Sequence, residues 1–365
     1  MQADHLHVPI AVRSRSGPRA LEVEGLDALL QGLPFTSRRR WLQAWADTHP
    51  DWDPWLVTVE DGELLGAAPL ARRRRGPLWD VVLLGHGPTD DARLPATGPA
   101  AAQALAAAVH EGLRGTWRLR LQQVPVDDPV VGALAARLPH VRLDAAQGMP
   151  LVRITDREPT TYLSRNTRKA LAKIGNRLKA AGPEPELRWT QDADEVVALL
   201  PELQRVHRER DLALDRRPDH DDPQAAAFYR TVIERHARAG EVDLLTLRLG
   251  GDLAAFVCGF RDGRVLRSWD NRLAPRWAEL SAGRIANTEA LRHAVQDGGY
   301  DALDWMRGEE PYKLQSATEV VPTAALTAWS SAALRRADEL GVRAAAAART
   351  SPHLTRIGKR VRALR

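Results

Sequence analysis

Two stretches far apart in the sequence share one pattern, and this repeat limits the possible folds more than any other feature. Leu56–Ala68 and Leu245–Val257 each read as an apolar strand, a tight turn and a second apolar strand. The turn is Asp-Gly in the first hairpin and Gly-Gly in the second. Each hairpin precedes a further strand, a loop, a helix and another strand, so a duplicated α/β unit is the simplest explanation. The alternative is two unrelated domains that share common hairpin turns.

The length agrees with two domains. A chain of 365 residues exceeds what one compact core usually accommodates. We expect a flexible arm over residues 1–20, an N-terminal domain over 21–150, a C-terminal domain over 151–328 and a basic tail over 329–365, either helical or disordered. Hydrophobic residues make up 44% and charged residues 27% of the chain, which is typical of a globular protein.

Composition also bounds the setting. No run approaches the ~20 apolar residues of a membrane helix, and the N-terminus shows no secretion signal. The single cysteine, Cys258, excludes an internal disulfide, so a reduced, cytoplasmic location is expected. The net charge of +5 and the sequence pI near 9.7 favour anionic partners without selecting one. No arrangement of His, Cys and carboxylates has metal-ligand spacing, so we expect no metal site.

The stretch Arg264–Lys313 carries the strongest indication of a site. It reads as a strand that ends at Asp270, an irregular loop, a helix that begins near Ser281, and a second short strand. A helix that begins after such a loop presents unpaired backbone N–H groups, which suit an anionic group such as a pyrophosphate. The same residues are equally compatible with an ordinary βαβ unit whose loop binds nothing.

Four motifs resemble a known family. They are Tyr162–Leu171, Leu249–Ala254, Leu280–Gly283 and Tyr300–Lys313. Together they resemble a subfamily of GNAT acyltransferases that includes cellulose-biosynthesis and biotin-cluster-associated acetyltransferases and is similar to Fem-type peptidoglycan-bridge transferases. The resemblance covers roughly residues 21–326 and is most specific in the last motif.

This resemblance implies an α/β fold of two GNAT-like domains in tandem, each with a mixed, mostly antiparallel sheet flanked by helices. It implies acyl-coenzyme A, usually acetyl-coenzyme A, as the donor. The pyrophosphate would lie on the helix start at Ser281, Ala282, Gly283 and Arg284. The sequence has a single glycine there, whereas the usual GNAT motif has two, and the preceding Glu279 would repel phosphates unless it turned away.

Transfer of an acyl group to an amine needs a base, an oxyanion donor and an acid for the leaving thiolate. Asp270 and Asp304, at two strand ends, are the candidate bases or orienting groups, and Tyr312 is the candidate acid. Each has a structural alternative, since an Asp at a strand end is often a cap or an ion-pair member and a Tyr can simply pack.

The candidate substrate-binding residues come from four segments and are Asp90, Arg168, Trp269, Arg307 and Lys313. Arg307 and Lys313 would hold an anionic group, and Trp269 would line the acceptor pocket. Arg168 belongs to a predicted basic helix, Ser164–Ala181, whose charges are equally compatible with a solvated face.

Three functions remain open at this point. The first is an acyl-coenzyme A-dependent N-acyltransferase, with acetyl as the expected acyl group, that acts on an amine of a small molecule or cell-envelope precursor. The second is a Fem-type transferase that uses aminoacyl-tRNA, and the third is a catalytically silent GNAT-like binding module. The tail carries seven Arg or Lys residues and no acid from Arg343 onward, and it would either contact an anionic partner or remain disordered.

Overall fold

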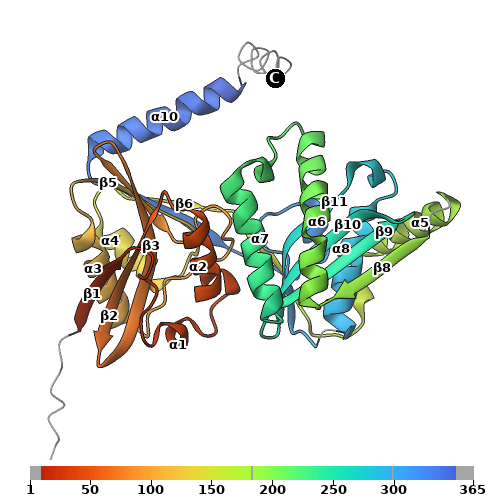
Figure 1. Ribbon diagram of the computed structural model, residues 1–365, viewed down its shortest axis with the longest axis horizontal. Coiled ribbons are helices and arrows are strands. Elements are labelled where there is room, and N and C mark those ends of the chain that lie inside the picture. Colours follow the sequence, from red (N-terminus) through yellow and green to blue (C-terminus); the bar gives the residue numbers. More distant parts are fainter. Residues whose placement is uncertain (1–9, 182–183, 298, 351–365) are drawn as a thin grey trace, which may run out of the picture.

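The protein contains two mixed sheets, each with helices on its faces (Figure 1). A computed structural model describes residues 10–181, 184–297 and 299–350. The order in sheet A is β1 (Ala11–Ser16), β2 (Asp53–Asp61), β3 (Glu63–Arg75), β4 (Leu78–Leu83), β5 (Thr116–Pro125), β14 (Thr323–Trp329), β6 (Arg142–Ala145). The order in sheet B, from the opposite edge, is β8 (Pro185–Thr190), β9 (Val242–Leu249), β10 (Asp252–Asp262), β11 (Val265–Leu273), β12 (Ala302–Asp304), β7 (Met149–Arg153), β13 (Glu319–Val321).

The helices divide between the two sheets. Those around sheet A are α1 (Leu26–Leu30), α2 (Arg39–Thr48), α3 (Pro99–Gly112) and α4 (Pro129–Arg137). Those around sheet B are α5 (Arg165–Ala181), α6 (Ala193–Ala213), α7 (Pro223–Arg238), α8 (Ala282–Arg292) and α9 (Pro311–Leu314). A last helix, α10 (Ala332–Thr350), leaves sheet A after β14. No helix in the described ranges has the length and apolar character needed to cross a membrane.

The two sheets repeat the same plan, which supports the duplication inferred from the hairpins. In each sheet a meander of three antiparallel strands leads through a helix to a parallel partner, β4 with β5 in sheet A and β11 with β12 in sheet B. The tandem GNAT-like arrangement implied by the resemblance is therefore confirmed, with mixed, mostly antiparallel sheets flanked by helices.

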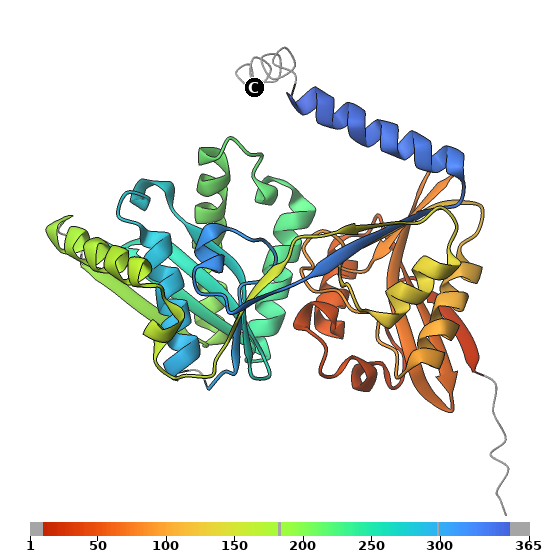
Figure 2. The same cartoon turned by 180° about the vertical axis from the view of Figure 1, so that it is seen from behind.

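The sixth strand of sheet A, β14, comes from the far end of the chain, after all seven strands of sheet B. After β6 the chain crosses to sheet B as β7, and after β13 it crosses back to sheet A as β14. The two crossing segments run side by side, and the Ala146 N–H donates to the Thr323 carbonyl at 2.9 Å (Figure 2). Most of β14 thus lies in the predicted C-terminal domain, 151–328, but β14 pairs in sheet A, because pairing across the ladder decides which sheet a strand joins.

The N-terminal arm needs a further correction, and the described part of the tail follows one of the two predicted alternatives. Residues 11–16 of the expected flexible arm form β1, which is held by antiparallel pairing with β2, whereas residues 1–9 lie outside the described ranges. The tail is helical as far as Thr350, and residues 351–365 also lie outside those ranges.

One apolar cluster joins the two domains. It packs α2 of the first domain against α7 and β10 of the second. At its centre Trp41 is fully buried and lies edge-on to Phe228, with ring centroids 4.9 Å apart, and to Trp269, at 5.5 Å. Ion pairs surround this cluster, including Arg40 with Glu241 at 2.6 Å. These contacts hold the domains against each other and determine the shape of the space between them.

Candidate functional site

The site begins at an irregularity in β11. Cys258 pairs with Asp270 and Gly259 pairs with Ser268, so Trp269 is an extra residue on β11 opposite this step of β10. A bulge of this kind reorients the side chains around it. Trp269 and Asp270 consequently line the same cavity, although neighbours in a regular strand point to opposite faces.

β11 also separates from its parallel partner. The two strands pair only from Val265 to Arg267 on β11, and β12 then ends at Asp304 while β11 continues to Leu273. The second half of β11 is therefore not paired on that side. The helix that follows, α8, starts beside this opening.

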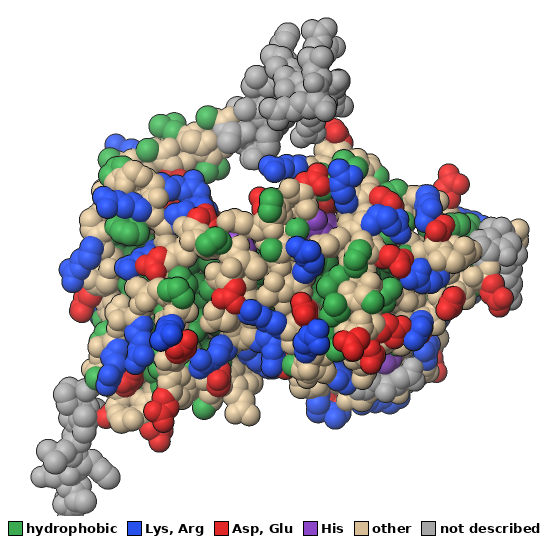
Figure 3. All heavy atoms as spheres, viewed as in Figure 1, with side chains coloured by type: hydrophobic (Ala, Val, Ile, Leu, Met, Phe, Trp, Pro, Cys, Tyr) green, Lys and Arg blue, Asp and Glu red, His purple; other side chains and the backbone are tan. Residues whose placement is uncertain are grey.

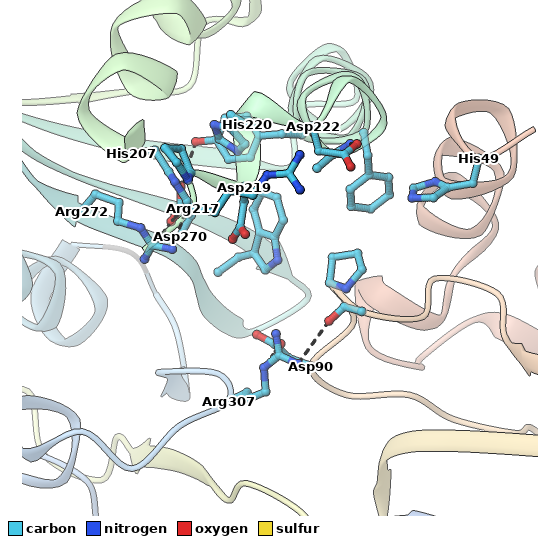
Figure 4. Close-up of a pocket in the computed structure, with 17 residues that line it drawn as sticks. His49, Asp90, His207, Arg217, Asp219, His220, Asp222, Asp270, Arg272 and Arg307 are labelled. Carbon is cyan, nitrogen blue, oxygen red and sulfur yellow. Dashed lines mark hydrogen bonds and ion pairs between the residues drawn. The ribbon is translucent and has the colours of Figure 1, made fainter. Parts of the chain in front are cut away.

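A cavity of about 510 Å³ lies between the two domains at the bulge (Figure 4). The first domain contributes His49, Gly87, Pro88 and Asp90. The second contributes His207, Arg217, Pro218, Asp219, His220, Asp222, Ala225, Phe228, Tyr229, Trp269, Asp270, Arg272 and Arg307. The volume is in the range of sites for small molecules, and the walls combine aromatic rings with charges of both signs.

Asp270 is the most thoroughly bonded group in the cavity. Its carboxylate accepts a hydrogen bond from the Tyr229 hydroxyl at 2.9 Å and pairs with Arg272 at 3.2 Å. His207 Nε2 lies 3.9 Å away, and its Nδ1 faces Asp211 at 3.2 Å. Burial raises the pKa of Asp270, but Arg272, His207 and the Tyr229 hydrogen bond together hold that pKa below its usual value. A carboxylate held in this way is a weak base and a good orienting group.

Asp90 is the second buried carboxylate of the cavity, and it comes from the first domain. Its Oδ1 lies 2.9 Å from Nε of Arg307, which also donates to the Gly87 carbonyl at 3.2 Å. Burial raises the pKa of Asp90 to about 6, in spite of the opposing effect of Arg307. Such a group is ionised at neutral pH yet basic enough to accept a proton, which makes it the better base of the two.

His220 lines the cavity between two aromatic rings. Its ring centroid lies 4.2 Å from that of His207 and 4.4 Å from that of Tyr229. Burial lowers the pKa of His220 to about 4, so the imidazole is neutral at pH 7. Its Nδ1 is buried and has no hydrogen-bond partner among the described residues. An orphaned polar atom in a cavity wall is available to a ligand.

The structure separates the three residues predicted to be catalytic. Asp270 lines the cavity, whereas Asp304 pairs at 2.6 Å with the buried Arg267, which also contacts Asp262 and Asp91. Asp304 thus belongs to an ion network outside the cavity lining, because its strand ends short of the bulge. Tyr312 faces the α8 side of β11, where its hydroxyl donates to Asn271 Oδ1 at 3.1 Å. Burial raises the pKa of Tyr312 to about 12, so the hydroxyl stays protonated.

The predicted donor-binding residues do begin α8, but two of them have local roles. Ser281 lies in the left-handed region, with φ 59°, and makes no side-chain cap. A Cβ at Gly283 would lie 2.7 Å from Leu273 Cδ2, so packing against β11 already requires this glycine. Ala282 is buried, and Arg284 donates to Gln315 at 3.0 Å.

The predicted substrate-binding residues divide into two groups. Asp90, Trp269 and Arg307 line the cavity. Lys313 does not: its side chain is buried, donates to the Arg307 carbonyl at 2.5 Å, and pairs with Glu310 at 3.1 Å. Arg168 lies on α5, outside the cavity lining, and donates to the Thr160 carbonyl. Lys313 therefore positions the turn that carries Arg307, and Arg168 lies on a solvated helix face.

Sequence reasoning missed the wall formed by α6, α7 and the segment between them. These elements supply His207, Arg217, His220 and Tyr229. The one usable signal was the i,i+4 spacing of His207 and Asp211, which places an imidazole and a carboxylate on one helix face. No group of three or more potential metal ligands occurs in the described part of the chain.

Comparison with known families matches residues 165–314 to the acetyltransferase (GNAT) domain. Among solved structures, FemX has a TM-score of 0.58 at 10% identity and covers 82% of this chain and 94% of its own. L-PGS from Bacillus licheniformis has a TM-score of 0.50 at 14% identity, over 88% and 96% of the two chains. A tandem GNAT protein from the clavulanic acid biosynthesis pathway has a TM-score of 0.47 at 13% identity, over 88% and 99%. No curated protein sequence matches the chain significantly.

The segment that matches the acetyltransferase (GNAT) domain contains α8, the bulged β11 and Tyr312. Over 82% of its length the chain shares the fold of FemX.

Proposed function

We propose that this protein is an acyl-coenzyme A-dependent N-acyltransferase, with acetyl-coenzyme A as the expected donor. The acceptor is an amine of a small molecule or cell-envelope precursor bound in the cavity between the domains. One observation carries the proposal: the bulged end of β11 faces the cavity through Asp270 and faces α8 through Asn271, which accepts from Tyr312. Two reactants bound on these two sides would meet at β11.

The second domain is the better place for the donor. In the first domain the equivalent helix, α3, begins with Pro99, which has no N–H to offer a phosphate. The space beside β5 is partly occupied by the chain itself, since the Ala92 N–H donates to the Gln123 carbonyl at 2.8 Å.

The start of α8 fits a pyrophosphate better. The N–H groups of Ser281 and Arg284 donate to the Ala278 and Ser281 carbonyls, and those of Ala282 and Gly283 at the helix start are left to receive an anion. Two guanidinium groups lie nearby: Arg284 on the helix, and Arg177, which donates to the Glu279 carbonyl at 2.7 Å. Glu279 itself is exposed, so its charge is largely screened from this position.

The side chains divide the chemistry between them. A bound acyl thioester supplies the activated acyl group. Asp90 accepts the proton that the attacking amine must lose, directly or through a water molecule. Asp270 orients polar groups in the cavity through Tyr229 and Arg272, and the protonated Tyr312 hydroxyl donates toward the leaving sulfur.

Donor binding is the first test. Acetyl-coenzyme A at ~100 times its Kd should stabilise the fold by roughly 2.7 kcal/mol, which a thermal-shift assay detects readily. Arg284→Glu should abolish this shift, and Arg216→Glu, an exposed arginine outside the cavity lining, should retain it. Absence of a shift in the wild-type protein, together with no release of free thiol when amines are added, would refute the proposal.

A transferase that uses aminoacyl-tRNA is the second candidate, and the exposed face of α5 favours it. That face carries Arg165, Arg168, Lys169, Lys173 and Arg177. On the face drawn in Figure 3, however, Lys and Arg side chains alternate with Asp and Glu and form no continuous basic surface. Binding of charged tRNA that weakens steeply with salt, without any effect of acetyl-coenzyme A, would favour this function. Donor binding without thiol release would instead favour a silent module.

A further inference from the structure

Some of the charged side chains that line the interdomain cavity form ion pairs with each other, and others do not. Asp90 pairs with Arg307, and Asp270 pairs with Arg272. Arg217 and Asp219 also line the cavity, and neither side chain makes a hydrogen bond or an ion pair with a described residue. Figure 4 shows both on the segment between α6 and α7.

In the two paired sets, the cations are the groups that face the cavity. The side chain of Arg307 is 36% exposed, against 9% for Asp90. The side chain of Arg272 is 32% exposed, against 6% for Asp270. In each pair the guanidinium group is therefore the partner that is more accessible to an incoming anion.

Opposite charges without partners on one short segment suit a ligand that carries both charges. The carboxylate of Asp219 matches an ammonium group, and the guanidinium of Arg217 matches a carboxylate or phosphate through paired hydrogen bonds. The rings of Trp269, Phe228 and Tyr229 supply apolar surface for the remainder of the ligand.

We propose that the acceptor is an amino-acid-like compound, with an anionic group near its amine, and that Arg217 together with Arg307 binds this anion. The inference rests on the proposed function in that the bound amine is the one acylated. The ligand class itself follows from the cavity alone. A carboxylate and a phosphate satisfy the same guanidinium geometry, so the experiment distinguishes them.

The test is calorimetric binding to the full-length protein, with and without acetyl-coenzyme A, using matched pairs of probes. L-phenylalanine is compared with L-phenylalaninamide, and phosphoethanolamine with ethanolamine. Each anion-bearing member should bind at least about tenfold more tightly than its uncharged partner, as expected for hydrogen bonds to charged groups. The pair with the larger ratio identifies the anion as carboxylate or phosphate.

Arg217→Gln should remove most of this ratio and leave the binding of the amides and alcohols unchanged. Arg216→Gln, an exposed neighbour outside the cavity lining, serves as the control and should keep the ratio. Three outcomes would overturn the inference. They are equal affinity within the matched pairs, an equal loss of affinity for both members of a pair in Arg217→Gln, and no binding by any probe. Selective binding without thiol release from acetyl-coenzyme A would instead refute the proposed function and leave the ligand class standing.

Discussion

The pH dependence of transfer should report on the pair formed by Asp90 and Arg307. Asp90 accepts a proton only when it is ionised, and burial raises its pKa to about 6. The value of kcat/KM should therefore be constant above that pH and fall tenfold per unit below it. In Arg307→Gln the neighbouring positive charge, 2.9 Å from the carboxylate, is lost. Loss of an opposite charge at this distance raises a pKa by about one to three units.

The acid limb should move accordingly, from about 6 to between about 7 and 9. At pH 7 a shift of two units would leave about a tenth of Asp90 ionised, and the rate would fall by the same factor. Asp90→Asn should remove this limb altogether and slow turnover by ~10²–10⁴-fold.

Two controls make the assay specific. The acceptor amine titrates as well, so the profile is measured with two acceptors of different amine pKa, and only the limb common to both belongs to the enzyme. Arg40→Gln removes another arginine of the domain interface that is similarly exposed, 38% against 36%, but pairs with Glu241 away from the cavity lining. Its profile should match the wild type. An unchanged acid limb in Arg307→Gln would refute the assignment of Asp90 as the base.

Three further outcomes follow from the geometry. Tyr312→Phe should lower kcat by ~10²–10⁴-fold in steady-state assays and leave acetyl-coenzyme A affinity within about threefold, so near-normal turnover would remove its role as acid. Asp304→Asn should lower the free energy of unfolding in urea by about 1–3 kcal/mol, because Arg267 loses a buried partner, and should leave kcat within a few-fold. A large loss of kcat at unchanged stability would return Asp304 to the catalytic residues. Gly283→Ala should lower the free energy of unfolding by about 1–3 kcal/mol, because the added methyl group would press on Leu273. Leu273→Ala in the same chain should recover part of this loss, and the absence of any coupling between the two substitutions would mean that packing does not explain the glycine.

The fold was predictable because its signals are local. Each hairpin combines alternating or continuous apolar residues with a turn dipeptide, and both occur in the predicted order. The return of β14 to sheet A was not predictable in the same way. Thr323–Trp329 reads as an apolar strand whichever sheet accepts it, because pairing partners depend on contacts between residues far apart in the chain.

The residues of the candidate site also differ in how far the sequence predicts them. Asp270, Trp269, Asp90 and Arg307 were found because they lie near predicted strand ends or in the turn motif that carries the family resemblance, and strand ends meet at one sheet edge. Spacing alone does not tell which way a side chain points. The side chain of Lys313, six residues after Arg307, points back to the Arg307 carbonyl and not toward the cavity. His207 and Tyr229 lie on helices with apolar faces, where they read as ordinary core residues.

The contacts between the domains explain how a site can be divided between them without losing its geometry. Asp90 comes from the loop after β4, and its counterpart in sheet B is the loop after β11 that leads to α8. In the first domain the Ala92 N–H donates to the Gln123 carbonyl on β5, so part of this loop lies along its own parallel strand, while Asp90 lines the cavity shared with the second domain. The two segments that cross between the sheets are hydrogen-bonded to each other through Ala146 and Thr323, and one apolar cluster packs α2 against α7 and β10. These contacts hold the two walls of the cavity against each other, so the loop that carries Asp90 and the strand that carries Asp270 keep their positions across it.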